Sequence, residues 1–330
     1  MSEAVPIGIL SVEHVHASAY AALLSKMDAA DFVGVADSNP KHGRSFAAEF
    51  DTDYMESNTL LEKVEGVLIC AANEDHLPWV KQAASAGVDI LCEKPLSTSK
   101  AVADDIIQIC DGYDVDLGVA MPLRHSVPAQ RASAALEHGD IGELRSVVGT
   151  NRGKMPGGWF VDPEAAGGGA AMDHTVHIVD LIHWITGERV TEVYAELDTR
   201  FYDLNVEDVN VLSMKLSDGT QFSLDGSWSR PEHWDFWGDA TVELIGTDGV
   251  LSVDCFDETF KQTQDTGEEP GIESIYWGDD PNASLLEDFI ESIQTNSTPL
   301  ATGEEGRDAV AVLEAVYESA HRGEPTDVTY

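Results

Sequence analysis

Lys94 lies in the segment VDILCEKPL, residues 88–96, where a short apolar run is followed by a charged pair and a proline. Such a run is typical of a buried parallel strand, and ligands of open α/β sheets bind beyond the carboxyl ends of their strands. Because Pro95 disfavours helix at the residue before it, we expect Glu93 and Lys94 to lie in an extended turn. An ammonium group held there can stabilise negative charge on an oxygen atom. The alternative is a strand-end ion pair that faces water.

Asp173 and His177 are the second pair of residues suited to chemistry. They lie four residues apart within residues 170–186, whose apolar residues recur at helical spacing up to Gly187. This spacing places both side chains on one face of a helix. A carboxylate beside a histidine raises the basicity of the ring and fixes its orientation. The pair therefore suits removal of a hydroxyl proton by His177, with Asp173 orienting the ring; a histidine satisfied inside the core is the alternative.

A metal site in the same helix is a further alternative, because residues of ligand type recur there: Asp173, His174, His177 and Asp180. We expect His174 to point away from the face that holds Asp173 and His177, and the sequence has no HExxH motif. The cysteines are far apart, lack CxxC spacing and are expected to be buried reduced thiols: Cys70, Cys92, Cys110 and Cys255. We therefore expect no metal ion.

Residues 1–122 are expected to form the domain that positions Lys94. Short apolar strands alternate with helices, which implies right-handed crossovers and one parallel sheet, as in a dinucleotide-binding Rossmann domain. The expected strands are residues 5–10, 32–36, 67–71, 88–92 and 115–120. The expected helices are residues 16–27, one that ends near residue 64, one that ends near residue 86, and residues 97–110.

Residues 123–330 are expected to form an α+β domain for substrate binding and oligomerisation, which supplies Asp173 and His177. A helix at residues 127–138 precedes strands joined by turns such as SDG at 217–219 and TDG at 247–249. Successive hairpins make a large, mostly antiparallel open sheet with helices on one face, so the chain belongs to the α/β class. The expected strands are residues 147–152, 190–197, 208–216, 221–228, 241–245 and 249–253.

Asp37 follows the second expected strand, where a carboxylate of a dinucleotide fold binds the adenosine ribose hydroxyls. A carboxylate at this place repels a 2′-phosphate, so we expect NAD as the cofactor. Ser38, Lys41 and Arg44 lie close enough in sequence to weaken this preference, and NADP stays possible.

The expected phosphate-binding turn lacks its usual glycines. Only Gly8 remains where a GxGxxG motif would stand, so backbone approach to a pyrophosphate needs another solution. Ser11 is small enough to replace a glycine, Glu13 should point outward, and His14 or His16 could donate to phosphate. The alternative is that this turn binds no phosphate.

Three residues outside the catalytic pair are candidates for substrate contact. Arg124 follows the last strand of the first domain and suits a hydroxyl or carboxylate, with a domain-junction ion pair as the alternative. Trp159, in MPGGW, and to a lesser degree Trp234, in HWDFW, suit an aromatic platform for a sugar ring, although tryptophan is more often a core or interface residue. His174 lies beside the catalytic pair.

The charge balance limits the partners and the setting. Lys and Arg number 19 against 60 Asp and Glu, which gives a net charge of −41 and makes nucleic acid or an anionic membrane an improbable partner. Because the apolar fraction is normal and periodic, we expect a folded chain with a haloadapted surface, not an acidic disordered one. No signal peptide or apolar run of about 18 residues is found, so a soluble cytoplasmic protein is expected.

Several segments together resemble the glucose-fructose oxidoreductase, inositol 2-dehydrogenase and MocA family, Gfo/Idh/MocA. The specific pairing is EKP at residues 93–95 with a downstream DxxxH at residues 173–177. Further similar segments are VLICAANEDH, the residues 121–124, HGDIGEL, AGGGAAMDHTVHIVDLIHWITG, LLEDFIESI and the helix that contains GEEG, so the resemblance covers nearly the whole chain. The departure is the phosphate turn.

The resemblance implies an NAD(P)-dependent oxidoreductase that transfers hydride between a nicotinamide and a sugar, polyol or sugar derivative. His177 would take the hydroxyl proton, while Lys94 would polarise the reacting oxygen and contact the cofactor ribose. A homodimer or homotetramer built through the C-terminal sheet is also implied. The rival hypothesis is a non-catalytic nucleotide or sugar sensor on the same fold. The residues expected to bind the cofactor are Gly8, Ser11, Val12, His14, Asp37, Ser38, Ala71, Asn73, His76, Glu93 and Lys94.

Overall fold

The first 120 residues build a parallel sheet with helices on both faces. The computed structural model describes residues 4–330 except 235, 257–258, 265–270, 277 and 279. The sheet has the order β3-β2-β1-β4-β5-β6, so the strand order reverses between β1 and β4. Its strands are β1 (Val5–Leu10), β2 (Ala30–Ala36), β3 (Asp53–Tyr54), β4 (Gly66–Ile69), β5 (Asp89–Cys92) and β6 (Leu117–Val119). This confirms the expected parallel sheet of a Rossmann fold.

The helices of this part are α1 (His16–Leu24), α2 (Pro40–Glu49), α3 (Ser57–Leu61), α4 (His76–Ser85) and α5 (Lys100–Tyr113). The helix expected to begin near residue 97 begins three residues later, because the Ser99 side chain accepts a hydrogen bond from the Val102 amide and caps the first turn. Short 3-10 turns, η1 (Asn73–Asp75) and η2 (Pro122–His125), follow β4 and β6. They turn the chain away from the sheet at its carboxyl edge.

The second sheet is mostly antiparallel, as expected, with the order β12-β11-β7-β10-β9-β8-β15. All of its neighbouring strands run antiparallel except β7 and β10, which run parallel. Alternate residues of β9 are buried and exposed, so one face of the sheet packs against helices and the other is open. The strands are β7 (Leu144–Thr150), β8 (Val190–Asp198), β9 (Val209–Leu216), β10 (Gln221–Asp225), β11 (Thr241–Gly246), β12 (Val250–Asp254) and β15 (Thr326–Asp327).

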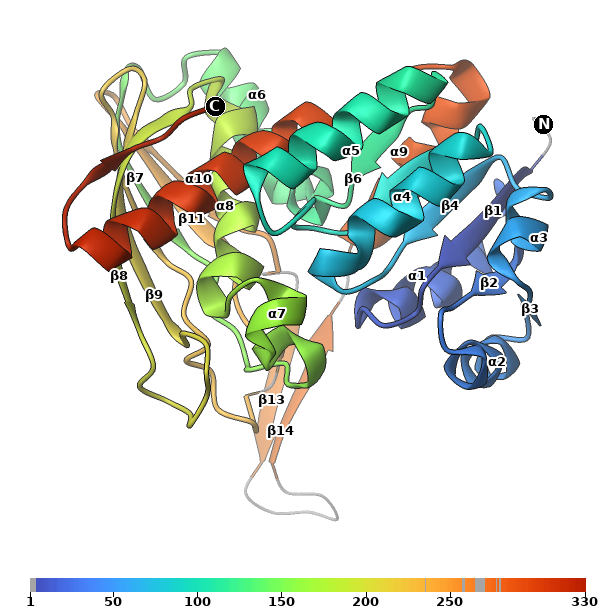
Figure 1. The fold of residues 1–330 in the computed structure, drawn as a ribbon. Helices are drawn as coiled ribbons and strands as arrows, with labels where there is room; N and C mark the ends of the chain where they lie inside the picture. The colour runs from blue at the N-terminus through green and yellow to red at the C-terminus, as the bar shows by residue number, and fades with distance from the viewer. Residues whose placement is uncertain (1–3, 235, 257–258, 265–270, 277, 279) are drawn as a thin grey trace.

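Four longer helices pack against the two sheets (Figure 1). Their bounds are α6 (Val127–Glu137), α8 (Ala170–Thr186), α9 (Pro281–Thr295) and α10 (Gly303–Arg322). Val312 and Val316 of α10 belong to the core under the second sheet, whereas Ala309 and Leu313 of the same helix pack in the core of the first. Two shorter helical segments, η3 (Gly158–Val161) and α7 (Pro163–Ala166), lie just before α8.

The chain crosses back to the first sheet near its end. Leu286 and Phe289 of α9 are buried in one cluster with Ile7 and Tyr20 of the first domain. Burying side chains of this size contributes roughly 1.5–3 kcal/mol each. The core of the N-terminal sheet therefore includes residues far beyond residue 122. The division of the chain into two domains at residue 122 stays a prediction.

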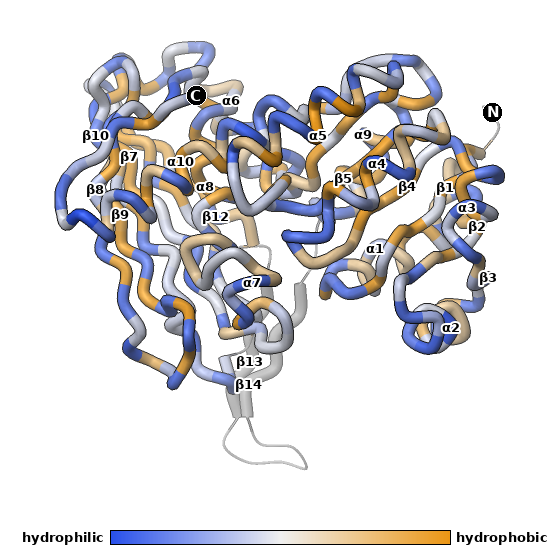
Figure 2. The backbone as a smooth tube through the Cα atoms, in the orientation of Figure 1, coloured by the Kyte–Doolittle hydropathy of each residue, from blue (hydrophilic) through white to orange (hydrophobic). Residues whose placement is uncertain are grey.

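A separate hairpin, β13 (Thr259–Gln264) with β14 (Gly271–Tyr276), extends away from both sheets (Figure 1). This hairpin lies outside the strands expected from the sequence. Figure 2 shows hydrophobic stretches along the strands of both sheets and hydrophilic loops around them. Among the described residues, no helix combines the length and the apolar character needed to span a membrane.

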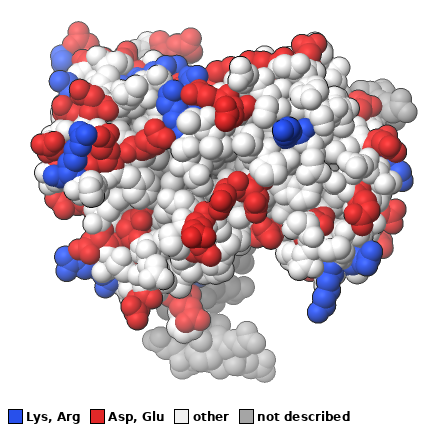
Figure 3. Space-filling view, viewed as in Figure 1, with Lys and Arg blue, Asp and Glu red and all other residues white. Residues whose placement is uncertain are grey.

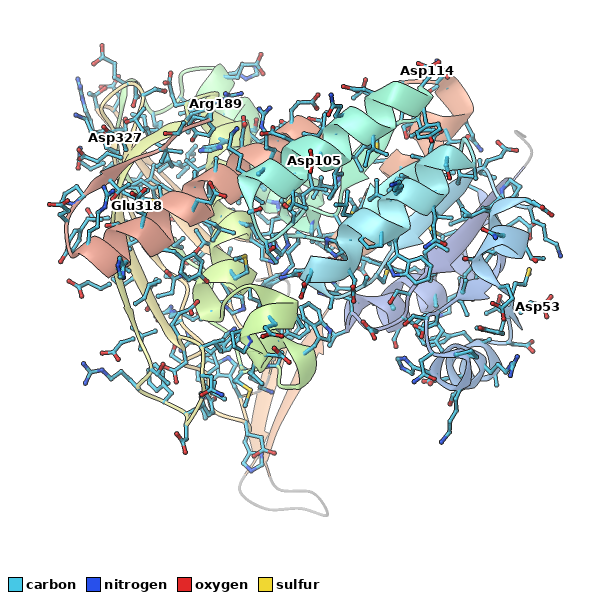
Figure 4. The ribbon with its side chains drawn as sticks, viewed as in Figure 1. Asp53, Asp105, Asp114, Arg189, Glu318 and Asp327 are labelled. Carbon is cyan, nitrogen blue, oxygen red and sulfur yellow. The ribbon has the colours of Figure 1, made fainter. Side chains whose placement is uncertain are left out.

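Acidic side chains spread over the visible face of both domains, and basic ones are sparse (Figure 3). The labelled side chains in Figure 4 include exposed acids on distant elements: Asp53 on β3, Asp105 on α5, Asp114 after α5, Glu318 on α10 and Asp327 on β15. The negative charge of the visible face is therefore spread over many elements and is not confined to one patch. Salt screens such repulsion over about 8 Å at physiological ionic strength and over shorter distances in concentrated salt.

Candidate active site

Lys94 and Asp173 meet where the end of β5 faces the start of α8. Lys94 follows β5 and is 3% exposed, and its Nζ lies 2.8 Å from Asp173 Oδ1 and 3.1 Å from the Asp173 backbone oxygen. Asp173 lies in the first turn of α8, where the positive end of the helix dipole also favours a carboxylate. The peptide bond between Lys94 and Pro95 is cis. The two candidate groups that lie far apart in sequence therefore share one site.

Glycines before α8 allow this helix to start close to Tyr317 and to the backbone of Glu207. A Cβ atom on Gly168 would lie 1.8 Å from the Tyr317 hydroxyl, and one on Gly169 would lie 2.1 Å from the backbone oxygen of Glu207. The Glu207 carboxylate in turn accepts hydrogen bonds from the Gly169 and Ala171 amides. The GGG segment is thus needed for close packing at the start of the helix.

Asp173 does not orient His177 in the way expected from their spacing. Its second oxygen lies 3.2 Å from Nε2 of His174 and accepts a hydrogen bond of 3.2 Å from the Trp228 indole. The expectation that His174 points away from Asp173 is therefore wrong, because the backbones of adjacent residues still allow both side chains to turn toward the pocket. His174 Nδ1 also faces the Gly226 carbonyl at 3.0 Å, so both ring nitrogens face oxygen acceptors.

His177 lies in the same pocket with a free ring edge. Its Nδ1 is buried and has no hydrogen-bond partner among the residues that the structure describes. Burial and the nearby Lys94 ammonium hold the pKa of His177 well below its usual value, so the ring is neutral at neutral pH. Burial acts to raise the pKa of Asp173, but the Lys94 and His174 charges lower it well below its usual value. The site thus combines a neutral imidazole with an ion pair.

A pocket of about 750 Å³ holds these groups. Its polar lining residues include Lys94, Asn151, Lys154, Asp173, His174 and His177. Its apolar lining residues include Pro122, Leu123, Phe160, Phe236, Trp237 and Phe256. Aromatic faces beside a few convergent polar groups are typical of small-molecule sites.

Arg124 is a structural residue, and its expected role in substrate contact is wrong. Its guanidinium forms a two-point pair with Asp180, at 2.8 and 2.6 Å, and also donates to Glu305 and to the Leu300 carbonyl at 2.9 Å. Arg124 is 1% exposed and is not among the described residues that line the pocket. The alternative of an ion pair at the domain junction is the one observed.

The tryptophans are placed differently from the expectation. The Trp159 indole donates to the Glu13 carbonyl at 3.2 Å and stacks on Phe160, with ring centroids 3.9 Å apart. Phe160, one residue on, lines the pocket in its place. In the HWDFW run Trp237 lines the pocket, Trp234 lies under the Arg230 guanidinium, and residue 235 is outside the described residues.

The turn after β1 is braced by Asp37. Val12 donates to Asp37 Oδ2 at 2.9 Å, and Asn39 donates to Oδ1 at 2.7 Å. Ser11 takes a left-handed conformation with φ of 62°, the conformation that glycine adopts most easily, and Glu13 points outward as expected. Gly8 lies inside β1, where a Cβ would meet Leu60 at 3.1 Å, so its small size serves packing against α3.

Two expected cofactor residues are engaged with the protein. Both ring nitrogens of His76 face backbone carbonyls, those of Leu96 at 3.1 Å and Ala71 at 3.3 Å, and the residue is fully buried. His76 therefore cannot contact a ligand as expected. The Asn73 amide donates to the Ala166 carbonyl at 2.8 Å, which ties η1 to α7. Ala71 is buried beyond β4, and Ser38 is exposed after β2.

His14, His16 and Glu93 form a compact group that is not expected from the sequence. His16 Nδ1 lies 2.9 Å from Glu93 Oε1, and His14 Nδ1 lies 3.5 Å from the same oxygen. Burial lowers the pKa of His14 to about 3, so the ring is neutral. The HxH spacing in the turn was the available signal, but only the structure shows that Glu93 faces it.

The comparisons with known proteins agree with this architecture. Residues 7–121 match the model described as oxidoreductase family, NAD-binding Rossmann fold, and residues 129–252 match that of the GFO/IDH/MocA C-terminal domain. The chain is 25% identical over 315 residues to the uncharacterized oxidoreductase YrbE of Bacillus subtilis, covering 90% of this chain and 89% of that one. It is 25% identical to the myo-inositol 2-dehydrogenase of Thermotoga maritima, with 92% of each chain covered.

A relative from a halophile is the NADP-dependent D-xylose 1-dehydrogenase of Haloarcula marismortui, which is 25% identical with 78% of this chain and 72% of the relative covered. Among solved structures, GenD2 from gentamicin A biosynthesis in complex with NAD has a similar fold, with a TM-score of 0.91, 23% identity and coverage of 100% and 98%. Together with the two sheets and the Lys94, Asp173 and His177 pocket, the matched models show that this chain belongs to the Gfo/Idh/MocA family of NAD-binding Rossmann-fold oxidoreductases.

Proposed function

We propose that this protein is an NAD-dependent dehydrogenase that oxidises a hydroxyl group of a sugar, a polyol or a sugar derivative. The observation that supports this most is the meeting of a buried ammonium, its paired carboxylate and a neutral histidine in one pocket between the two domains. The substrate class follows the names of the dehydrogenases to which the chain is similar. A pocket with aromatic walls and several polar groups suits such a ligand.

The residues at the carboxyl edge of the first sheet fit a dinucleotide. The strand order reverses beside β1, and Asp37 closes β2 at the place where a ribose is held. α1 begins at His16, directly after the turn that follows β1, and the positive end of its dipole suits a phosphate without the usual glycines. Val12, Ser11 and Lys94 stay the proposed cofactor contacts, with Asp37 favouring NAD. When bound, the nicotinamide supplies the hydride acceptor.

In this proposal His177 accepts the hydroxyl proton of the substrate. The ring is neutral, which is the state that a base requires. Lys94 lies within reach of the same pocket and stabilises negative charge on the reacting oxygen. Asp173 holds Lys94 and His174 in place, so it is a positioning residue for the ammonium. His174 is a proposed substrate contact.

The setting and the assembly are also proposals. The acidic surface supports a protein adapted to concentrated cytoplasmic salt. The open face of the second sheet exposes Val148 of β7 at 41% and Val211 of β9 at 45%, which supports a homo-oligomer formed through this face. Light scattering after gel filtration in molar KCl would test it; a monomer at all concentrations would contradict it.

A titration of NAD and NADP in molar KCl, followed by a screen of sugars and polyols for NADH formation, tests the proposal. We expect NAD to bind more tightly than NADP and at least one polyhydroxylated compound to be oxidised. A non-catalytic sensor would bind a nucleotide or a sugar without turnover. Failure of both nucleotides to bind would contradict the dehydrogenase.

A further inference from the structure

Three metal-ligand side chains converge beside the pocket, at the end of β1 and β5. They are His14, in the turn after β1, His16, the first residue of α1, and Glu93, which follows β5. One ligand atom from each lies within 4.8 Å of the other two. The His14 and Glu93 side chains are each 1% exposed, whereas the His16 side chain is 32% exposed. The group is therefore buried on one side and open on the other.

Hydrogen bonds alone leave two acceptor atoms facing each other. His14 Nδ1 accepts a hydrogen bond from the His16 amide at 3.2 Å, so its lone pair is on this nitrogen and its proton is on Nε2. The same Nδ1 lies 3.5 Å from a carboxylate oxygen of Glu93. Each atom already faces one nitrogen of His16, its amide for His14 Nδ1 and its ring Nδ1 for Glu93 Oε1, and a cation between the two atoms would offset their mutual repulsion. In addition, His14 Nε2 is buried without a partner among the described residues.

The spacing suits a zinc ion. Zinc bonds of about 2.1 Å to nitrogen or oxygen in a tetrahedral site place the ligand atoms about 3.4 Å apart. The observed separations of 2.9 Å and 3.5 Å from Glu93 Oε1 lie close to this value. Two imidazoles with one carboxylate are a donor set of zinc sites that keep an open fourth position. Magnesium and calcium prefer all-oxygen sites, so they fit less well.

We propose that His14, His16 and Glu93 bind one zinc ion whose fourth coordination position faces the pocket. His14 and His16 both line the pocket, and the partly exposed His16 gives the ion a path of entry. On binding, zinc replaces the His16 amide hydrogen at the one lone pair of His14 Nδ1, and the His16 ring carries its proton on Nε2 so that its Nδ1 becomes a ligand. Glu93 keeps its second oxygen for the Lys94 amide, which lies 3.1 Å away.

Zinc at this position should also affect the binding of NAD, a consequence that rests on the proposed function. The turn lacks the glycine amides that usually approach a pyrophosphate, and a bound cation would place positive charge there instead. NAD should then bind more tightly in the presence of zinc. Zinc binding itself does not depend on that function, so the zinc site and the proposed function can be disproved separately.

The test uses the full chain, stripped of metal by a chelator and titrated with Zn²⁺ and with Co²⁺ in molar KCl. We expect one zinc per chain by elemental analysis and a visible Co²⁺ spectrum of four-coordinate type. His16→Ala and Glu93→Gln should each weaken zinc binding by more than about tenfold, since even outer-shell changes cost that much. His42→Ala is the matched control, because His42 lies in the same domain with a side chain 48% exposed and should leave zinc affinity unchanged.

Circular dichroism of each variant separates a lost site from a lost fold. If Glu93→Gln does not fold, the partly exposed His16→Ala still decides the question. Absence of zinc binding to the folded wild-type chain would overturn the proposal and leave the three residues as a hydrogen-bonded brace. Equal zinc affinity in wild type, His16→Ala and Glu93→Gln would overturn it as well.

Discussion

Lys94 Nζ and Asp173 Oδ1 lie 2.8 Å apart in a buried ion pair. The residues are 79 positions apart in sequence, and each is positioned by a different element, the end of β5 and the first turn of α8. The pair therefore contributes both to the junction of the two sheets and to the proposed chemistry. Changes at this pair should affect stability as well as turnover.

Lys94→Ala should lower the free energy of unfolding by about 3–5 kcal/mol, the usual cost of leaving one member of a buried pair uncompensated. Among the described residues, the Asp173 carboxylate would keep its contacts with His174 and Trp228. Urea unfolding at fixed salt measures the effect. The control is Lys100→Ala, which removes an i,i+4 surface pair with Asp104 and should cost less than about 1 kcal/mol. Equal effects of the two substitutions would contradict a buried ion pair.

Arg124→Ala should also destabilise the protein by about 3–5 kcal/mol, because it leaves Asp180 buried without its partner. The double substitution Arg124→Met with Asp180→Leu should recover most of this loss, since well-packed apolar groups of similar volume can replace a buried pair. Chemical unfolding of both variants tests this. A stable Arg124→Ala protein with a raised KM would instead indicate that Arg124 contacts substrate.

The pH dependence of oxidation should follow His177. Burial and the Lys94 charge lower the pKa of His177 below its usual value of 6.5, and the proposed base must be neutral. Activity should therefore be constant through neutral pH and fall only as the pH drops below 6.5 toward the lowered pKa. A profile of kcat/KM against pH measures the midpoint. An acid limb centred above pH 6.5 would contradict the assignment.

Gly169→Ala should strongly destabilise the start of α8. The added Cβ would lie 2.1 Å from the Glu207 backbone oxygen, so the backbone must shift, at a cost of about 1–3 kcal/mol or more. Gly112→Ala is the matched control, because it lies in α5 with open space around its Cβ and should stabilise the helix by up to about 1 kcal/mol. Thermal unfolding of the two variants measures their melting temperatures. Similar melting temperatures would show that an added Cβ at Gly169 meets no close contact.

The sequence predicted the strands and helices near the site well, for physical reasons. The strands of the first sheet are covered on both faces and read as short apolar runs, and α8 begins and ends at the expected residues, followed by Gly187 in a left-handed conformation. Pro95 and the DxxxH spacing located Lys94, Asp173 and His177. These signals are local, so one sequence is enough to find them.

Contacts between residues far apart in sequence could not be predicted from such local patterns. Arg124 binds groups 56 and 181 positions away, and no local pattern distinguishes such a pair from a substrate contact. The direction of the His174 side chain depends on Trp228 and Gly226, which lie at the end of a distant strand. The amphipathic period of α9 predicts a helix but does not say which sheet it packs against.

The most direct test of the account is a single-turnover measurement of hydride transfer with His177→Ala, once a sugar or polyol substrate has been found for the wild type. General-base catalysis contributes about 10²–10⁴-fold, so NADH formation should slow by at least about 10²-fold while NAD affinity and the unfolding transition stay close to those of the wild type. NADH formation at a rate near that of the wild type would show that His177 does not accept the hydroxyl proton.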